Sequence, residues 1–320
     1  VELAYSKGIS AVHEMFVVEW RGWASLEAFM GSIADVALEV TPYVGTDDVT
    51  RVKELGLERI GGDYFLDGSF GSHTAWLSSP YASPPPSGSA PTGIRYRSDD
   101  DLLGFFLDAQ DAGLQTGVHA IGDAAIEQAI ATWEAVADKV GLEQVRARGH
   151  RIEHFECAGD DHIDRAARLG LRASVQPAFD RFWGGDEGLY AHRLGPDRAR
   201  MMNRFKTMLD AGLIVGAGSD STVTPLDPFL QMAALREHHV SDERVGPRVA
   251  LMLHSYGGHA LVGEAVAAER GSLEIGKRAD LAWLDRDPAT IETVELLETE
   301  VLGTWIGGRR VWPKTAAEVA

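Results

Sequence analysis

The stretch QTGVHAIGD, residues 115–123, is a short apolar run that ends on His119 and opens into a loop. Two later stretches repeat the pattern, because RIEHFE ends its run on His154 and GAGSDS carries Asp220 directly after its own. Each run has the length and composition of a strand in a buried parallel sheet. A lone histidine at a strand end is usually a hydrogen-bonded structural residue, but three metal-binding residue types on separate strand ends indicate a shared site.

Strands alternate with helices along the chain, and this alternation decides the fold class. Helical patterns begin at Ser98, Asp123 and Pro196, which are residue types that favour the start of a helix. Repeated strand-then-helix units imply right-handed crossovers and a parallel sheet of the α/β class, and their number favours a (β/α) barrel over a doubly wound sheet. The seven predicted strands are residues 9–13, 36–44, 59–66, 115–119, 151–155, 171–176 and 213–219.

In a barrel of this kind the chemistry lies at the carboxyl ends of the strands, where His119, His154 and Asp220 all fall. Neutral imidazoles and an ionised carboxylate together hold a divalent ion and leave a position open for water. The three residues therefore predict a metal-dependent hydrolase. Because side chains alternate across a strand, Arg151 and Glu153 are expected on the face opposite His154, as a structural or supporting pair.

Composition narrows the classes of partner and compartment. The 320 residues are 45% hydrophobic and 24% charged, which suits one barrel-sized core with a smaller appendage. The formal net charge of -18 disfavours nucleic acid as a partner, and no apolar run approaches the ~20 residues of a membrane-spanning helix. The single cysteine, Cys157, excludes an internal disulfide and agrees with a reducing compartment. We expect a cytoplasmic protein with a small-molecule substrate; a homo-oligomer is left open.

A set of motifs in a fixed order resembles a known family. DGSFGSHTA, HAIGD, RIEHFE, SVQP, GSDS and GSLEIGKRADLAWLD are similar, in this order, to the motifs of the metal-dependent amidohydrolase superfamily. Within it they resemble the branch of N-substituted formamide deformylase-like enzymes, over about residues 8–312. The resemblance implies a (β/α)8 TIM-type barrel, with strands two to eight in residues 1–262, and part of a small β-sandwich, mainly structural, in residues 263–320.

The resemblance also implies roles for single residues. It makes His119 the metal ligand of strand five, His154 the ligand of strand six, and Asp220 both a ligand and the proton shuttle of strand eight. The cofactor it implies is one or two divalent ions, zinc above all. The reaction it implies is hydrolysis, by a metal-activated water, of carbon–nitrogen bonds other than peptide bonds, in amides, N-acyl or N-formyl compounds or cyclic amides.

Two departures from the family pattern bear on the site. The His-x-His pair that opens the family's first barrel strand occurs nowhere in the chain, which starts at Val1 almost directly with a strand. We therefore expect an upstream segment of the same protein to supply that strand. Where many relatives have a metal-bridging lysine, GGDYFLDG has Asp63, which could be a metal ligand or a structural hydrogen-bond acceptor.

Two long loops are expected to select the substrate. Residues 75–98 are rich in proline and serine, as in an irregular, partly rigid lid. Asp67 and His73, just before this loop, are candidate substrate contacts, and His73 stands where relatives often show an arginine. In residues 177–195, Phe179 and Trp183 could form an apolar substrate pocket or simply pack the loop.

Three functions stay open on the sequence alone. The first is the amide hydrolase described above. The second is a deaminase on the same scaffold, because both reactions use an activated hydroxide. The third is a barrel that lost its first-strand ligands and acts as a non-catalytic binding or structural partner.

Overall fold

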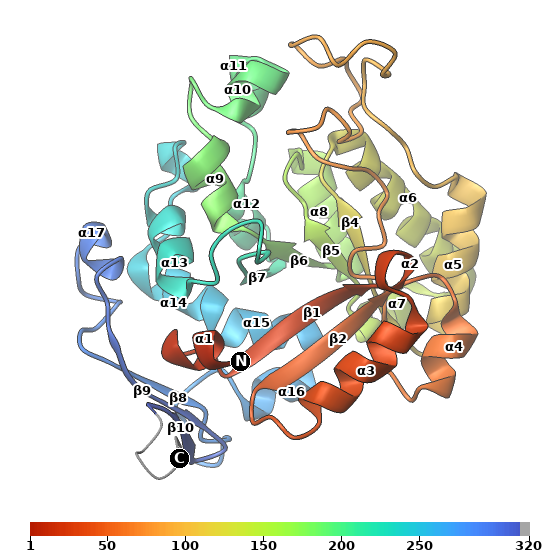
Figure 1. The fold of residues 1–320 in the computed structure, drawn as a ribbon. Helices are drawn as coiled ribbons and strands as arrows, with labels where there is room; N and C mark the ends of the chain where they lie inside the picture. The colour runs from red at the N-terminus through yellow and green to blue at the C-terminus, as the bar shows by residue number, and fades with distance from the viewer. Residues whose placement is uncertain (314–320) are drawn as a thin grey trace.

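A curled sheet of seven parallel strands organises the protein (Figure 1). The computed structural model describes residues 1–313. The strands pair in chain order: β1 (Ala11–Val17), β2 (Glu39–Gly45), β3 (Arg59–Ile60), β4 (Gln115–Ala120), β5 (Arg151–His154), β6 (Arg172–Val175) and β7 (Ile214–Ala217). The α/β class and the seven parallel strands confirm the prediction. Within residues 1–313 β1 does not pair with β7, so these strands form a curled, open part of a barrel wall, and the eight-stranded barrel stays a prediction.

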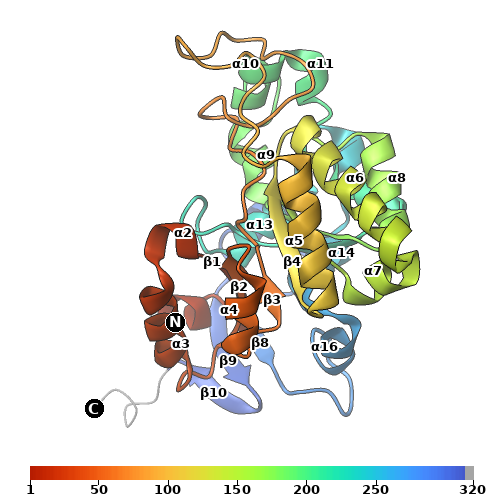
Figure 2. The ribbon, with the colours of Figure 1, turned by 90° about the vertical axis from the view of Figure 1, so that its right-hand side faces the viewer.

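Helices cover the outer face of the sheet and fill the connections between strands (Figure 2). The helices between the strands are α2 (Val18–Arg21), α3 (Trp23–Ile33), α4 (Val49–Glu54), α5 (Asp99–Asp111), α6 (Asp123–Val140), α7 (Leu142–Arg148), α8 (Asp160–Leu169), α9 (Pro177–Trp183), α10 (Leu189–Leu194), α11 (Pro196–Ala199) and α12 (Phe205–Asp210). Those outside the sheet are α1 (Glu2–Ser6), α13 (Pro228–Arg236), the 3-10 turn Ser241–Glu243, α14 (Pro247–His254), α15 (Tyr256–Val262), α16 (Glu264–Glu269) and α17 (Thr293–Leu296). No helix within residues 1–313 combines the length and apolar character that crossing a bilayer requires.

All three predicted helix starts are found, but the helix that begins at Pro196 is shorter than predicted. The Ser98 hydroxyl accepts the Asp101 backbone N–H at 3.1 Å, so it caps α5 as its residue type predicts. The helix predicted from Pro196 ends after one turn, and the chain resumes as α12 at Phe205. Asn203 explains the break, because its φ of 55° is left-handed and its N–H bonds to the Glu156 carbonyl at 2.9 Å.

The third strand is shorter than the predicted residues 59–66. Gly61 and Gly62 both have positive φ, and a Cβ on Gly61 would lie 2.0 Å from the Gly117 carbonyl oxygen, so only glycine fits there. The pairing resumes later, because Phe65 forms an isolated parallel bridge with His119. The interruption lifts Asp63 out of the strand beside the carboxyl end of β4.

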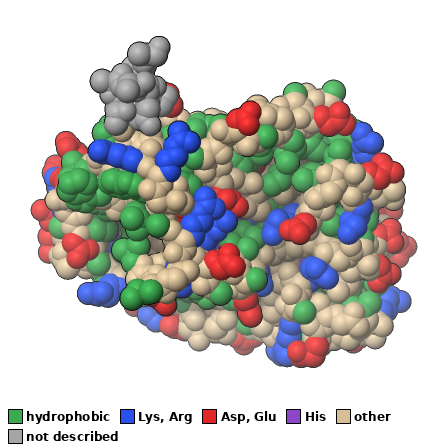
Figure 3. Space-filling view, turned by 90° about the horizontal axis from the view of Figure 1, so that it is seen from below, with side chains coloured by type: hydrophobic (Ala, Val, Ile, Leu, Met, Phe, Trp, Pro, Cys, Tyr) green, Lys and Arg blue, Asp and Glu red, His purple; other side chains and the backbone are tan. Residues whose placement is uncertain are grey.

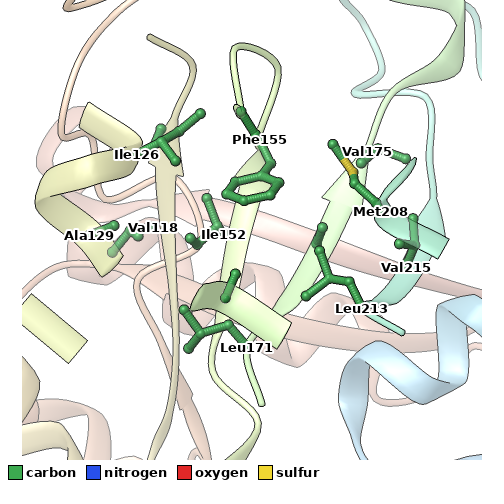
Figure 4. Close-up of a cluster of buried hydrophobic side chains, with 14 of the residues drawn as sticks. Val118, Ile126, Ala129, Ile152, Phe155, Leu171, Val175, Met208, Leu213 and Val215 are labelled. Atoms are coloured by element: carbon green, nitrogen blue, oxygen red, sulfur yellow. The ribbon is translucent and has the colours of Figure 1, made fainter. Parts of the chain in front are cut away.

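The hydrophobic core lies between the sheet and its covering helices (Figure 4). Val118 of β4, Ile152 of β5 and Val215 of β7 each point to the outer face of the sheet, toward the helices. Ile126 of α6 and Met208 of α12 pack against this outer face. The inner face of the same strands is left for the polar residues described below. This layer holds the strand ends in place.

The two predicted substrate loops pack together as one unit at the top of the molecule (Figures 1 and 2). Their backbones join where Ala82 N–H donates to the Arg193 carbonyl at 2.8 Å. The side chain of Arg198, just after the second loop, also donates from Nη2 to the Pro80 carbonyl at 2.7 Å. A separate buried cluster fills the space between them, made of Phe70, Ala75, Leu77, Tyr81, Ile121, Tyr190, Leu194 and Met202. We call this unit the lid.

A small antiparallel sheet follows the last helices, with β8 (Leu281–Leu284), β9 (Val301–Ile306) and β10 (Arg309–Trp312). It packs against α1, where Thr304 Oγ1 donates to the Tyr5 carbonyl at 2.7 Å. From below, hydrophobic side chains gather at this end of the molecule (Figure 3). A sandwich needs two sheets, and residues 263–313 contribute only this one, so the β-sandwich and the domain boundary at residue 262 stay predictions. Residues 314–320 lie outside the described part of the chain.

Candidate functional site

Two buried histidines meet at neighbouring strand ends. His119 lies near the end of β4 and His154 is the last residue of β5, and these strands pair directly. The ring centroids are 4.4 Å apart and the rings meet edge to face. The two imidazoles therefore lie together, but convergence of His119, His154 and Asp220 on one ion stays a prediction, because no group of three possible ligands is gathered within residues 1–313.

The backbone of His154 explains how its ring reaches His119. Regular alternation would turn His154 outward with Ile152, whereas Glu153 pairs in register with His119 and faces inward. The φ of His154 is 72°, a left-handed value that breaks the alternation and brings its ring inward. The expectation that Arg151 and Glu153 lie on the face away from the His154 ring is therefore wrong, because all three reach the interior.

Arg151 and Glu153 form a buried ion pair beneath the two histidines, with Nη2 to Oε2 at 2.7 Å. Arg151 also lies 4.4 Å over the Tyr43 ring and 2.8 Å from His13 Nδ1, so it links β5 to β1 and β2 across the curl. His13 was not among the predicted site residues. A buried guanidinium needs such partners, since an unpaired charge in the interior is costly.

The hydrogen bonds of the two imidazoles leave nitrogen lone pairs available. His154 Nδ1 donates to Gln176 Oε1 at 2.8 Å, which places the lone pair on Nε2, and that atom has no hydrogen-bond partner within residues 1–313. His119 Nδ1 is buried 3.3 Å from Asp67 Oδ1 without forming a hydrogen bond. Burial lowers the pKa of His119 to about 4 and also lowers that of His154, so both rings are neutral at pH 7.

Acidic side chains surround the imidazole pair. Burial raises the pKa of the Asp63 carboxyl to about 7, and the charges of Asp220 and Glu153 act in the same direction. The negative charge of Asp220 also acts to raise the pKa of His119 and His154, so its field reaches both rings. Asp220 follows β7 in a left-handed conformation, with φ of 49°. Such backbone strain in non-glycine residues concentrates at functional sites.

The donor types fit a divalent metal, although the set is not assembled. Among residues 1–313, no group of three or more His, Cys, Asp or Glu side chains is gathered closely enough to hold an ion. Two neutral imidazoles with spare lone pairs are nevertheless what zinc binds. The carboxylates that repel one another around Asp63 would be stabilised by a cation.

The four predicted substrate residues lie in different surroundings. Asp67 is fully buried and accepts backbone N–H groups from Trp76, Ile121 and Gly122 at 2.8–3.0 Å, so its visible contacts are those of a loop anchor. His73 lies inside the lid, with Nε2 3.1 Å from the Ser83 hydroxyl. Their roles in substrate binding stay predictions.

Phe179 and Trp183 do lie beside the histidine pair. The Phe179 ring is stacked on His154 with centroids 5.9 Å apart, and Trp183 packs on Phe179 at 4.5 Å. Both belong to α9, which begins at Pro177 directly after β6 and Gln176. They therefore form one wall of the candidate site.

The sequence as a whole places the chain in a family. Residues 19–312 match the profile of the amidohydrolase family. The chain belongs to this family. It is 30% identical over 279 residues to the putative amidohydrolase YtcJ of Bacillus subtilis, covering 81% of this chain and 50% of that protein. It is 28% identical over 234 residues to the N-substituted formamide deformylase of Arthrobacter pascens, covering 70% of this chain and 41% of that protein.

A solved structure agrees with this assignment. The chain superimposes with a TM-score of 0.74 on an uncharacterized metal-dependent hydrolase from Pyrococcus furiosus, with 29% identity, covering 90% of this chain and 58% of the other. The predicted superfamily is thus confirmed. This amidohydrolase chain spans about half the length of the curated relatives it matches.

Gln176 was not singled out in the sequence as part of the candidate site. Gln176 follows β6 in the motif SVQP, so its position directly after a strand was an available signal. The Phe65 ring lies against His119 and the Trp20 ring against Phe65, contacts that no local sequence pattern indicates. A cavity of about 640 Å³ between α5, α6 and the 76–95 loop is lined by none of the predicted site residues.

Proposed function

We propose that this chain is the metal-binding part of a hydrolase that cleaves carbon–nitrogen bonds other than peptide bonds in small amides. The observation that carries the proposal is the His119 and His154 pair, 4.4 Å apart with spare nitrogen lone pairs, beside Asp63 and Asp220. Membership in the amidohydrolase family supports it.

The proposed ligands are His119, His154 and Asp220, with Asp63 as a further oxygen donor. Gln176 fixes the His154 ring by accepting its Nδ1–H, a support that histidine ligands commonly have. Ligands from strand ends that are far apart in sequence come together only in the folded chain, so metal binding would also stabilise the fold. Zinc suits the two imidazoles best, since it favours nitrogen donors.

A divalent ion bound there would supply positive charge that polarises a substrate carbonyl and makes water acidic. The protein's own part would be to hold and move protons. The Asp220 carboxylate would take a proton from the attacking water and return it to the leaving nitrogen of the amide, as a general base and then a general acid. The apolar wall of Phe179 and Trp183 would exclude competing water and hold the substrate, with Asp67 and His73 supporting the loop above.

Metal analysis of the complete natural protein tests this proposal. Wild type, His119→Ala and His154→Ala are stripped of metal, reloaded with zinc and assayed for bound metal and for hydrolysis of N-formyl and N-acetyl amines. We expect both variants to lose zinc and hydrolysis while remaining folded. His162→Ala, a change on α8 outside the proposed ligand set, is the matched control. Full zinc content in either ligand variant, or wild-type protein that binds none, would overturn the proposal.

A further inference from the structure

The loop that carries Asp220 is closed by a buried threonine. Asp220 follows β7 with a left-handed backbone, at φ of 49°, and residues 221–223 after it are exposed. The chain then returns inward at Thr224, which is 1% exposed, and the Thr224 hydroxyl donates to the Ser219 carbonyl. That carbonyl belongs to the peptide bond that joins Ser219 to Asp220. A strained residue persists only where its surroundings fix it, and Thr224 fixes the backbone directly before Asp220.

A second buried side chain holds Thr224. Gln231 of α13 is 1% exposed, and its Nε2 donates to Thr224 Oγ1 at 3.0 Å. Its Oε1 accepts the Ala178 N–H at 2.8 Å. Because a backbone N–H can only donate, this contact decides which end of the amide is oxygen, and the other end must donate to Thr224. The hydroxyl proton of Thr224 is then free for the Ser219 carbonyl, so each of the three hydrogen bonds has one direction.

The same glutamine also anchors the segment after β6. Ala178 is the second residue of α9, and the first N–H groups of a helix have no partner within the helix. Helix α13 packs against α9 (Figure 1). The segment begins after Gln176, which accepts the His154 Nδ1–H, and it carries Phe179, which is stacked on His154. One buried amide therefore ties the segment that supports His154 to the loop that carries Asp220.

We propose that Gln231 and Thr224 are positioning residues, which set the place of the Asp220 carboxylate relative to the His119 and His154 pair. This proposal rests on the proposed role of Asp220 as metal ligand and proton shuttle. Buried amides commonly serve stability alone, since an unsatisfied one is costly. Gln231 differs because the groups it holds are two strand-end segments of the candidate site. A displacement of about 1 Å at a reacting group can cost about 100-fold in rate.

Two substitutions at Thr224 test the proposal in the complete natural protein loaded with zinc. Thr224→Val keeps the shape of the side chain but removes the hydroxyl, so the Ser219 carbonyl loses its donor. We expect the Kd for zinc to rise and kcat for N-formyl amines to fall, each about tenfold, while KM changes less than about twofold. Thr224→Ser keeps the hydroxyl and should restore both values to near those of wild type.

Thr132→Val is the matched control. Thr132 is 6% exposed on α6, away from the strand ends, and its hydroxyl also donates to a backbone carbonyl, that of Gln128, at 2.7 Å. The control should lower stability and leave the Kd for zinc and kcat unchanged. Gln231→Leu removes both hydrogen bonds of the amide and should weaken zinc binding at least as much as Thr224→Val. If Gln231→Leu does not fold, the Thr224 variants decide.

The zinc titration separates this inference from the hydrolysis itself. Zinc binding that depends on the Thr224 hydroxyl, without cleavage of any amide, would support the positioning role and overturn the hydrolase. Hydrolysis with wild-type Kd and kcat in Thr224→Val would overturn the positioning role and leave the hydrolase standing. A loss that Thr224→Ser does not reverse, or that Thr132→Val matches, would have the same meaning. Wild-type protein that binds no zinc would overturn both.

Discussion

His150 precedes β5 and His154 is its last residue, and the two histidines differ in how their ring nitrogens are bonded. Both are buried, at 0% and 6% exposure, and burial lowers the pKa of both. His150 has two satisfied nitrogens: Nδ1 accepts the Thr116 N–H at 3.1 Å, and Nε2 donates to Gln110 Oε1 at 2.9 Å. Its ring also stacks on Trp133 at 3.7 Å.

His154 uses only one of its nitrogens. Its Nδ1 donates to Gln176, its Nε2 has no partner among residues 1–313, and its backbone is left-handed. A second imidazole, His119, lies against it, and Asp63 and Asp220 contribute charge. Burial and a lowered pKa therefore do not distinguish the two histidines. The two histidines differ because His154 has an unbonded Nε2 and a left-handed backbone conformation.

Asp220→Asn should give the largest effect, a fall in kcat of about 10²–10⁴-fold, which is typical of removing a general acid–base. The amide cannot accept the proton of the attacking water, yet asparagine tolerates the left-handed conformation at this position, so the fold should persist. Steady-state kinetics measure the fall in kcat, and circular dichroism measures whether the fold persists. Asp100→Asn, an exposed position on α5, is the control. A wild-type kcat in Asp220→Asn would remove Asp220 from the mechanism.

Gln176→Leu tests the contrast between the histidines directly. Without its acceptor, the His154 ring loses its fixed tautomer and orientation, so the Kd for zinc should rise about 10–100-fold. Gln110→Leu removes the equivalent acceptor from His150 and is the matched control. We expect it to lower stability and leave zinc affinity unchanged. Zinc titration of both variants measures the two Kd values. An equal rise of Kd in Gln176→Leu and Gln110→Leu would mean that His154 and His150 do not differ in zinc binding.

The sequence predicted the sheet well, for a physical reason. Strand-like stretches alternate with helical patterns along the chain, and a parallel sheet covered by helices requires that alternation. The breaks were harder to predict. Gly61 and Gly62 interrupt β3 because the Gly117 backbone lies against them, and Asn203, whose N–H bonds to the Glu156 carbonyl, lies in the break between α11 and α12. Both depend on residues distant in sequence.

The candidate site could be predicted only in part. Strand ends pointed to His119 and His154, which do lie together. Alternation gave the wrong direction for Glu153 relative to His154, because a left-handed φ cannot be inferred from a histidine in sequence. The Trp20 and Phe65 stack joins α2, directly after β1, to the segment after β3, and only the folded chain brings them together.

His150→Leu should lower stability without affecting the site. The substitution leaves the Thr116 N–H and the Gln110 amide buried without their partner, which costs about 1–3 kcal/mol of unfolding free energy. Urea unfolding followed by circular dichroism measures the loss. His192→Leu, an exposed position on α10, is the control and should change stability by less than about 0.5 kcal/mol. A loss of zinc binding in His150→Leu would contradict the assignment of His150 as a structural histidine outside the zinc site.

The pH dependence of stability should show the smallest effect. Because burial holds the pKa of His150 well below 6.5 in the folded state, the unfolded chain binds a proton below pH 6.5 that the folded chain does not. His150 therefore contributes to a loss of stability as the pH falls below 6.5 towards its folded pKa, and contributes no pH dependence above 6.5. His150→Leu lacks this contribution, so the stability difference between wild type and variant should shrink from pH 7.5 to about pH 5. A difference that stays constant, or grows as the pH falls, would mean that His150 is protonated in the folded protein and that its Nδ1 does not accept the Thr116 N–H.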